Sequence, residues 1–455
     1  MEILQHILAF IVAIGILITF HEFGHYWVAR RFDVKILRFS VGFGRTLWRR
    51  KFGPDQTEFV IAALPLGGYV KMLDEREGEV LLADRPRAFN NKPVAQRFAI
   101  VAAGPLFNFI FAVFAYCVMY TIGMTGLKPL VDEVAPASVA ASAGFQSGDE
   151  ILAVDDRNTP TWAAVAETLI GSVVASGQVE INVQTAAGDR QIRRLDLSAV
   201  SIDDIAAGAL LEEIGLTPVR PPLPAVIGQV VADSPAAQAG IQPGDKIVAV
   251  DGQRVADWFA VVDRIRALPE QPVVLEIERD DRSLQIGLTP ALVTTDSGEQ
   301  VGQIGASVDT LPALPAELRG VERYAPWQAA WLGVKRTAEM SVLTLRMMGK
   351  ILTGQASVKN LSGPISIAQF AGFSAAVGLA AFLGFLAIVS VSLGVINLLP
   401  VPLLDGGHLM YYLIEIIKGS PVSESTQMLG QHVGLVLLLS LMTLVIYNDV
   451  VRLLG

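Results

Sequence analysis

Charged residues are scarce in this 455-residue chain, since only 17% are Asp, Glu, Lys or Arg whereas 52% are hydrophobic. A soluble domain usually carries about 25% charged residues, so the composition indicates a membrane protein of which only part is soluble. Cysteine is almost absent. Because Cys117 is the single cysteine, an intramolecular disulfide is excluded. It lies inside an apolar run, and we interpret it as a small buried or lipid-facing residue.

The chain has a net charge of −9, and its acidic and basic residues are unevenly distributed along the sequence. Residues 28–97 hold 14 Lys/Arg against 8 Asp/Glu, and residues 121–330 hold 14 against 29. The basic stretch lies directly between apolar runs, so it fits a cytoplasmic loop better than a nucleic-acid-binding surface. The acidic segment is then expected outside the membrane.

Four apolar runs are each close to the ~20 residues that a membrane-spanning helix needs. They cover residues 3–20 (continuing to 30), 98–120, roughly 375–399, and roughly 433–447 (extending to 454). The first run lacks a basic start and a small-x-small cleavage site, which favours a retained span over a signal peptide. We therefore predict a polytopic α-helical membrane protein with four transmembrane helices, for which a cytoplasmic membrane is the simplest match.

The acidic segment contains an internal repeat. Residues 140–155 match residues 236–251 at a constant offset of 96, and each copy indicates a short helix, glycine turns and a strand. Further strands are expected in both copies, at 179–184 and 192–197 and at 273–279 and 284–288. Two β-rich domains are therefore expected between the second and third spans. They resemble tandem PDZ domains of the bacterial type, which bind extended chains or chain ends by strand addition. Two inert spacer domains are the alternative.

The sequence His21-Glu22-Phe23-Gly24-His25 fits the H-E-x-x-H pattern and ends the first apolar run. Residues i and i+4 of a helix share one face, so both imidazoles can bind one metal ion. Zinc suits imidazole and carboxylate ligands, and its catalytic sites keep three protein ligands. Glu22 lies a step round the helix, where it can take a proton from activated water and pass it to the leaving nitrogen. The alternative is a pair of interfacial polar residues that cap the span.

A third ligand is expected where the third apolar run ends, in the sequence N-L-L-P-V-P-L-L-D-G-G-H that starts at Asn397. Asp405 precedes two glycines, which allow a close approach of the backbone. Pro400 and Pro402 keep this stretch non-helical, and such backbone is tolerated at membrane depth only against protein or a wet cavity. On chemistry alone His408 competes with Asp405 as the third ligand.

These paired motifs resemble those of the site-2 protease family of intramembrane metalloproteases, and the arrangement of spans and PDZ-like domains resembles its regulator-of-sigma-E protease group. The resemblance implies that His21, His25 and Asp405 bind Zn²⁺ and that Glu22 is the catalytic base. It also implies that Asn397 holds the substrate backbone or stabilises the oxyanion.

Two further segments carry the same resemblance. It identifies Gly67, Gly68 and Tyr69 with a β-like re-entrant loop that pairs with the substrate as an added strand. The sequence Gly104-Pro105-x-x-Asn108 in the second span also resembles a family motif, for which a helix kink is the alternative.

The resemblance implies a function in regulated intramembrane proteolysis. The substrate would be the spanning segment of a single-span membrane protein, typically an anti-sigma factor already cut by another protease in an envelope stress response. Remnant signal peptides would be a further substrate class. The protein would lie in a bacterial cytoplasmic (inner) membrane, with the PDZ-like domains in the periplasm and the active site towards the cytoplasm. Two alternatives are a membrane-tethered PDZ scaffold with an inactive metal site and a metal transporter.

These assignments divide the chain into consecutive parts. The first helix with its H-E-x-x-H motif takes 1–30, a cytoplasmic loop with the β-like re-entrant segment 31–96, the second helix 97–122, the PDZ-like domains 123–220 and 221–310, a juxtamembrane helical region 311–372, the third helix 373–408, and a cytoplasmic loop with the fourth helix 409–455.

Overall fold

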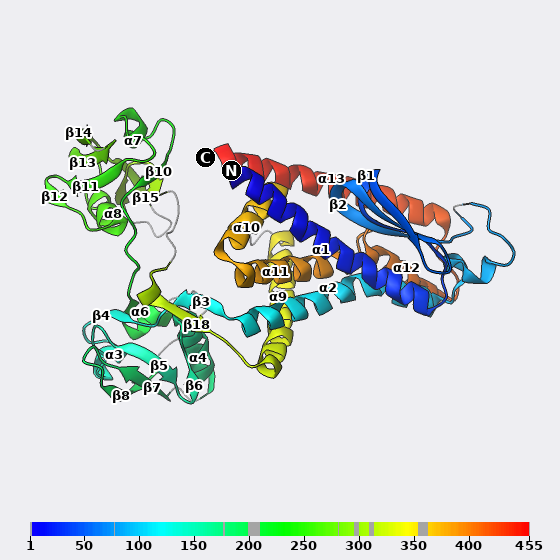
Figure 1. Cartoon of the computed structure of the whole chain (residues 1–455), viewed down its shortest axis with the longest axis horizontal. Coiled ribbons are helices and arrows are strands. Elements are labelled where there is room, and N and C mark those ends of the chain that lie inside the picture. Colours follow the sequence, from blue (N-terminus) through cyan, green and yellow to red (C-terminus); the bar gives the residue numbers. More distant parts are fainter. Residues whose placement is uncertain are drawn as a thin grey trace. The chain divides into compact units, whose positions relative to one another are not determined.

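The structure is a computed structural model that describes residues 2–76, 78–175, 178–198, 210–280, 282–294, 300–308, 314–353 and 363–454. The chain divides into two compact units. One unit combines Met1–Met124 with Arg323–Gly455 and holds the long helices, and the other, Thr125–Glu322, is rich in strands (Figure 1).

Four helices of the first unit are long and apolar enough to cross a membrane, which confirms the four predicted apolar helices. They are α1 (Glu2–Arg31), α2 (Val94–Ile122), α11 (Leu379–Asn397) and α13 (Glu424–Leu454). The described part of this unit also contains α9 (Pro326–Leu352), α10 (Pro364–Val377) and α12 (Asp405–Lys418).

Helix α2 is the centre of the first unit, because it packs against α1, α9, α11 and α12. Small side chains line these contacts: Ala13 of α1, Ala112 and Ala115 of α2, and Ala387 of α11 are all buried. Small residues let helix backbones approach closely, which is how apolar helices gain packing energy where water cannot drive their association. The arrangement brings the end of α1 and the start of α12 to the same helix.

The structure differs from the sequence prediction around the third and fourth spans. A single third helix over 373–408 is interrupted at Gly378, whose φ of 135° is open to glycine and ends α10 before α11 begins. Helix α11 itself ends at Asn397. The expected loop from 409 is instead the body of α12, an amphipathic helix that buries Leu409, Tyr411 and Tyr412 and ends at the left-handed Gly419.

Two long antiparallel strands, β1 (Ile36–Phe52) and β2 (Thr57–Met72), occupy half of the loop predicted at 31–96. Both strands bend, so each contributes twice to one sheet. Residues 38–41 of β1 pair with 58–61 of β2 on one side and with 68–71 on the other. The segment 68–72 therefore forms one edge of the described part of this sheet. Two short helices follow, η1 (Arg85–Arg87) and η2 (Phe89–Asn91).

The second unit contains two four-stranded sheets of the same strand order, β6-β5-β7-β8 and β12-β11-β13-β14. The first comprises β5 (Glu150–Val154), β6 (Arg157–Asn158), β7 (Gln178–Gln184) and β8 (Arg190–Asp196). The second comprises β11 (Lys246–Val250), β12 (Gln253–Arg254), β13 (Val273–Arg279) and β14 (Arg282–Leu288). Each sheet has its own buried apolar core, so the sequence repeat corresponds to two β-rich modules.

Shorter elements complete the second unit. The helices are α3 (Val139–Ser142), α4 (Trp162–Ala175), α6 (Leu210–Ile214), α7 (Pro235–Gln238), α8 (Trp258–Arg266) and η3 (Ala316–Leu318). The strands are β3 (Met124–Leu127), β4 (Val131–Val134), β9 (Leu216–Pro218), β10 (Ile227–Val230), β15 (Ala291–Thr294), β16 (Gln300–Gln303), β17 (Ala306–Val308) and β18 (Arg319–Glu322). Strand β18 pairs with β3, so the region 311–372 that was expected to be helical also contains a strand.

Candidate metal centre

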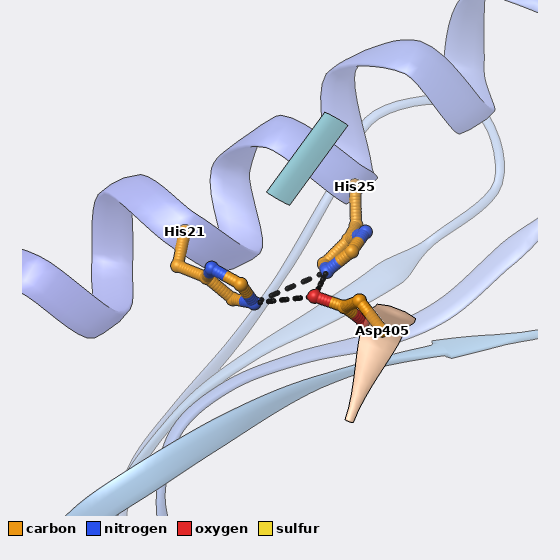
Figure 2. Close-up of side chains that lie close together, drawn as sticks. All are labelled: His21, His25 and Asp405. Atoms are coloured by element: carbon orange, nitrogen blue, oxygen red, sulfur yellow. Dashed lines mark hydrogen bonds and ion pairs between the residues drawn. The ribbon is translucent and has the colours of Figure 1, made fainter. Parts of the chain in front are cut away.

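Two histidines of α1 point to one side of the helix, one turn apart (Figure 2). The Nε2 atoms of His21 and His25 lie 3.3 Å from each other. This closeness follows from the helix itself, because residues i and i+4 lie one above the other on the same face. The H-E-x-x-H pattern is therefore realised in the geometry that a shared metal ion requires.

Asp405 brings a carboxylate to the same point from the far end of the sequence (Figure 2). Its Oδ2 lies 3.2 Å from Nε2 of His21 and 3.5 Å from Nε2 of His25. Asp405 is the first residue of α12, where the helix dipole favours a negative charge. Just before it, Leu403 has a φ of 89°, a left-handed conformation that costs a non-glycine residue on the order of 1–3 kcal/mol. The packing around this turn thus holds Asp405 in place against local strain.

The two glycines after Asp405 are required by close contacts. A Cβ on Gly406 would overlap the carbonyl oxygen of Leu399, and one on Gly407 would lie 2.6 Å from the carbonyl oxygen of Val401. The start of α12 therefore folds back tightly on the turn that follows α11. This is the close backbone approach that the sequence predicts for the Gly-Gly pair.

The three ligand atoms match a tetrahedral metal ion in spacing. Zinc binds imidazole nitrogen and carboxylate oxygen at about 2.0–2.2 Å, which places tetrahedral ligands about 3.3 Å from one another. The separations here are 3.2, 3.3 and 3.5 Å. The Oδ2 atom of Asp405 is also buried and has no hydrogen-bond partner in the described part of the chain. A buried, unsatisfied carboxylate oxygen beside two imidazole nitrogens fits a cation.

The other ring nitrogens of both histidines face α2. Nδ1 of His25 lies 2.9 Å from the carbonyl oxygen of Ile100, and Nδ1 of His21 lies 3.1 Å from the side-chain amide of Asn108. Metal-binding histidines usually make such an outer contact, which fixes the ring orientation and the tautomer. The role of Ile100 has no sequence signal, because a backbone carbonyl is common to every residue.

Glu22 lies between the two histidines in sequence and is buried, with 9% of its surface exposed. The edge segment of the β1–β2 sheet covers it closely, since a Cβ on Gly68 would lie 2.9 Å from Cγ of Glu22. Glu22 and Gly68 both line a cavity of about 990 Å³ that also contains the three candidate ligands. Glu22 is therefore near the metal centre without being one of its three ligands.

The same cavity brings together most of the remaining predicted site residues. Asn397, at the end of α11, and Tyr69, in the edge segment of β2, both line it. The hydroxyl of Tyr69 accepts a hydrogen bond from Arg38 at 3.2 Å, and its ring stacks on Phe43. Gly67 is not part of the lining; its Cα faces the ring of Phe43 so closely that a Cβ would overlap it.

His408 lines the cavity but does not belong to the group of three ligands. Its ring packs edge-on against Tyr411. Burial lowers the pKa of His408, although the nearby carboxylate of Asp405 acts to raise it. Of the two candidates for the third position, the described geometry brings Asp405, and not His408, to the histidine pair.

Sequence reasoning missed an ion pair in the cavity wall. The guanidinium of Arg97, in the first turn of α2, donates to the carboxylate of Glu415 in α12 at 2.6 Å. It also lies 5.0 Å from the ring centroid of Tyr412. These partners are 318 residues apart in sequence, and no local pattern connects them. The pair ties α12, which begins with Asp405, to α2.

The long apolar helices and the candidate three-ligand centre are the features expected of a membrane-embedded metalloprotease. The chain belongs to peptidase family M50, whose family model matches residues 9–441. This match, together with full-length relatives that are named regulator of sigma E protease, confirms the resemblance to site-2 proteases of the regulator-of-sigma-E type.

Curated relatives match the chain along its whole length. A regulator of sigma E protease from Salmonella typhi is 45% identical and RseP of Escherichia coli K12 is 44% identical, each with 100% of both chains covered. A protein from Neisseria meningitidis that is named as a zinc metalloprotease is 43% identical over 99% of both chains. Together with the apolar helices, these relatives indicate a bacterial inner-membrane protein.

The chain is also similar, over part of its length, to a solved structure. A PDZ domain from Listeria monocytogenes shares 20% identity and covers 20% of this chain and 90% of its own, with a TM-score of 0.16. A value this low supports no argument about either module.

Proposed function

We propose that this protein is an intramembrane zinc endopeptidase that cuts the membrane-spanning segment of a single-span protein. One observation carries the proposal: two imidazoles and a carboxylate converge at zinc-ligand spacing inside a unit of membrane-length helices, beside a buried glutamate. Polar groups of this kind are costly within a membrane and default to a functional role. The names of the relatives agree with a metalloprotease.

In this proposal His21, His25 and Asp405 hold Zn²⁺. When bound, zinc acidifies water and polarises the scissile carbonyl. Glu22 takes the proton from the attacking water and delivers it to the leaving amide nitrogen, so the peptide bond breaks without releasing a free amide anion. The carboxamide of Asn397, in the wall of the same cavity, hydrogen-bonds the substrate backbone or the oxyanion.

The substrate backbone pairs with the edge segment 68–72 of β2. This segment lies outermost in the described sheet and lines the cavity, so its outer edge and Glu22 face the same space. A helical substrate must be extended before its carbonyl carbon is reachable, and strand addition provides the hydrogen bonds that hold it extended. Gly68 lies against Glu22, and Tyr69 follows it in the wall of the same cavity.

The names of the relatives, which refer to regulation of sigma E, support a proposal for the substrate class. A single-span anti-sigma factor, already shortened by another protease in an envelope stress response, is the substrate we propose, with remnant signal peptides as a second class. The β-rich modules are PDZ-like domains on the periplasmic side that exclude uncut substrates or bind new chain ends. The metal centre then lies towards the cytoplasmic side.

Co-expression with a tagged single-span substrate tests this function. Glu22→Gln is expected to abolish cleavage while purified protein keeps its zinc, because the amide cannot accept the proton. Glu339→Gln on α9 is the matched control, an exposed glutamate paired with Lys335, and should cleave like wild type. Cleavage that persists in Glu22→Gln would instead favour a PDZ scaffold, with another protease responsible for the cut.

A further inference from the structure

The sequence Gly104-Pro105-x-x-Asn108 faces the histidine pair from the neighbouring helix α2. A Cβ on Gly104 would overlap Nε2 of His25 and would lie 2.9 Å from Cε1 of His21. Only glycine therefore fits at this point of α2. Pro105, one residue on, cannot donate the helix hydrogen bond to the carbonyl four residues earlier, which bends a helix locally.

The backbone of α2 determines which nitrogen of His25 carries the proton. Nδ1 of His25 lies 2.9 Å from the carbonyl oxygen of Ile100, an acceptor that has no proton to give. Nδ1 must therefore be protonated to make this contact, which leaves the lone pair of Nε2 facing Asp405. His25 is thus prepared as a ligand by the main chain.

Asn108 occupies the corresponding position for His21. Its amide nitrogen Nδ2 lies 3.1 Å from Nδ1 of His21, and the residue is fully buried in a spanning helix. Nδ1 can donate to Asn108 only if the amide turns its oxygen towards the ring, and the two orientations of an amide differ by a half-turn about one bond. Oδ1 of Asn108 is otherwise a buried oxygen without a hydrogen-bond partner in the described residues. With the oxygen facing the ring, Nε2 of His21 keeps its lone pair for the metal.

We propose that Asn108 is a positioning residue of the metal centre, which holds His21 in the tautomer and orientation that bind zinc. A third helix supports it, because the hydroxyl of Ser390 on α11 donates to the backbone carbonyl of Asn108 at 2.8 Å, and both residues are fully buried. Gly104 and Asn108 then act together, one by leaving space for the rings and the other by orienting one of them. This inference rests on the proposed metal site but not on proteolysis.

Zinc affinity of the purified full-length protein in detergent tests this role, measured by competition with a chromogenic chelator. Asn108→Leu is expected to weaken zinc binding by about 10- to 100-fold, the usual cost of losing such an outer partner. Asn108→Asp keeps an oxygen acceptor of the same reach and should bind zinc within a few-fold of wild type. If Asn108→Leu does not fold, Asn108→Ala, which only removes the amide, is measured in its place.

Ser366→Ala is the matched structural control. Its hydroxyl is buried in the same unit and donates to Asp449 at 2.6 Å, remote from the metal ligands. The variant should lose thermal stability without losing zinc affinity. Absorption spectra of the cobalt-loaded proteins provide a second readout, in which Asn108→Leu should change the ligand-field bands and Ser366→Ala should not.

The outcomes separate this inference from the proposed function. Wild-type zinc affinity in the Asn108→Leu or Asn108→Ala protein would overturn the role of Asn108, as would an equal loss in Ser366→Ala. A wild-type protein without zinc would overturn both proposals. Weakened zinc binding in Asn108→Leu, together with persistent cleavage by Glu22→Gln, would support the role of Asn108 and overturn the protease.

Discussion

An aspartate with a buried carboxylate oxygen has a different role in each of the two units of this protein. In the second β-rich module, Asp245 is 1% exposed and accepts two hydrogen bonds from Arg279, at 2.6 and 2.7 Å, and one from the backbone N–H of Gln242. In the helical unit, Oδ2 of Asp405 is buried beside two imidazole nitrogens and has no hydrogen-bond partner among the described residues.

The difference teaches how to recognise a ligand carboxylate. The charge of Asp245 is compensated within the chain, and the first module repeats the device with Asp149 and Arg193, 3.4 Å apart. Among the described residues Asp405 pairs with no arginine, and the two histidine nitrogens are the groups beside its Oδ2. A buried carboxylate oxygen that accepts no hydrogen bond is unfavourable, so this environment favours a bound cation.

Exchanging Asp405 for Asn should have the largest effect. Asp405→Asn removes a ligand, so zinc affinity should fall by more than the roughly 10- to 100-fold caused by losing an outer partner, and cleavage should be lost. Asp245→Asn, the matched exchange in the module, should keep wild-type zinc content. Elemental analysis of both purified proteins measures their zinc content. Equal zinc content in the two variants would contradict a role for Asp405 as a ligand.

Gly104→Ala should have the next largest effect. The added methyl group overlaps His25, so either helix α2 or the ring must shift, at a packing cost of about 1–3 kcal/mol and with loss of zinc. Gly15→Ala is the control, because a Cβ at Gly15 of α1 meets nothing within 4 Å. Thermal unfolding and zinc content check both, and a Gly104→Ala protein with full zinc occupancy would contradict the geometry.

Asp245→Asn should destabilise its own module and leave the metal centre intact. The neutral amide cannot compensate the charge of Arg279, so the charge-assisted hydrogen bonds of this pair are weakened. Hydrogen exchange of the full-length protein should therefore be faster in β11 and β13, with the helical unit unchanged. Asp233→Asn, on the exposed surface of the same module, should exchange like wild type; faster exchange throughout the chain would show that the two units do not respond separately.

The smallest predicted effect is a pH dependence of the second module. Burial acts to raise the pKa of Asp245, but the hydrogen bonds from Arg279 and from the backbone of Gln242 outweigh it and hold this pKa below its ordinary value. A lowered folded-state pKa stabilises the module above the unfolded pKa of about 3.9, and this stabilisation is lost as the pH falls through the folded value. Exchange protection of β11, corrected for the intrinsic rate, should therefore decline below about pH 4. Asp245→Asn should abolish that decline.

Sequence reasoning reached the parts of the fold and site that depend on local spacing. The i and i+4 histidines lie on one helix, as their spacing predicts. The repeat at an offset of 96 residues corresponds to two modules with the same strand order. Asp405 was harder, because chemistry alone left His408 as a competitor and the resemblance decided between them. The left-handed turn at Leu403 that orients Asp405 follows from packing and leaves no composition signal.

What could not be predicted depends on contacts between distant helices. The pairing of Arg97 with Glu415 and the contact of Asn108 with His21 join helices whose separation in sequence says nothing of their distance in space. Gly378 lies in a continuous apolar run, so hydropathy could not locate the break between α10 and α11. Helix α12 is amphipathic and shorter than a membrane span, so hydropathy does not separate its body from the loop predicted from residue 409.

X-ray absorption at the zinc edge of the purified protein tests the central claim most directly. The arrangement of His21, His25 and Asp405 predicts one zinc ion per chain, with two imidazoles and oxygen ligands at about 2.0–2.2 Å, and loss of that signal in Asp405→Asn. A zinc spectrum with a different number of imidazoles, or an unchanged spectrum in Asp405→Asn, would contradict it.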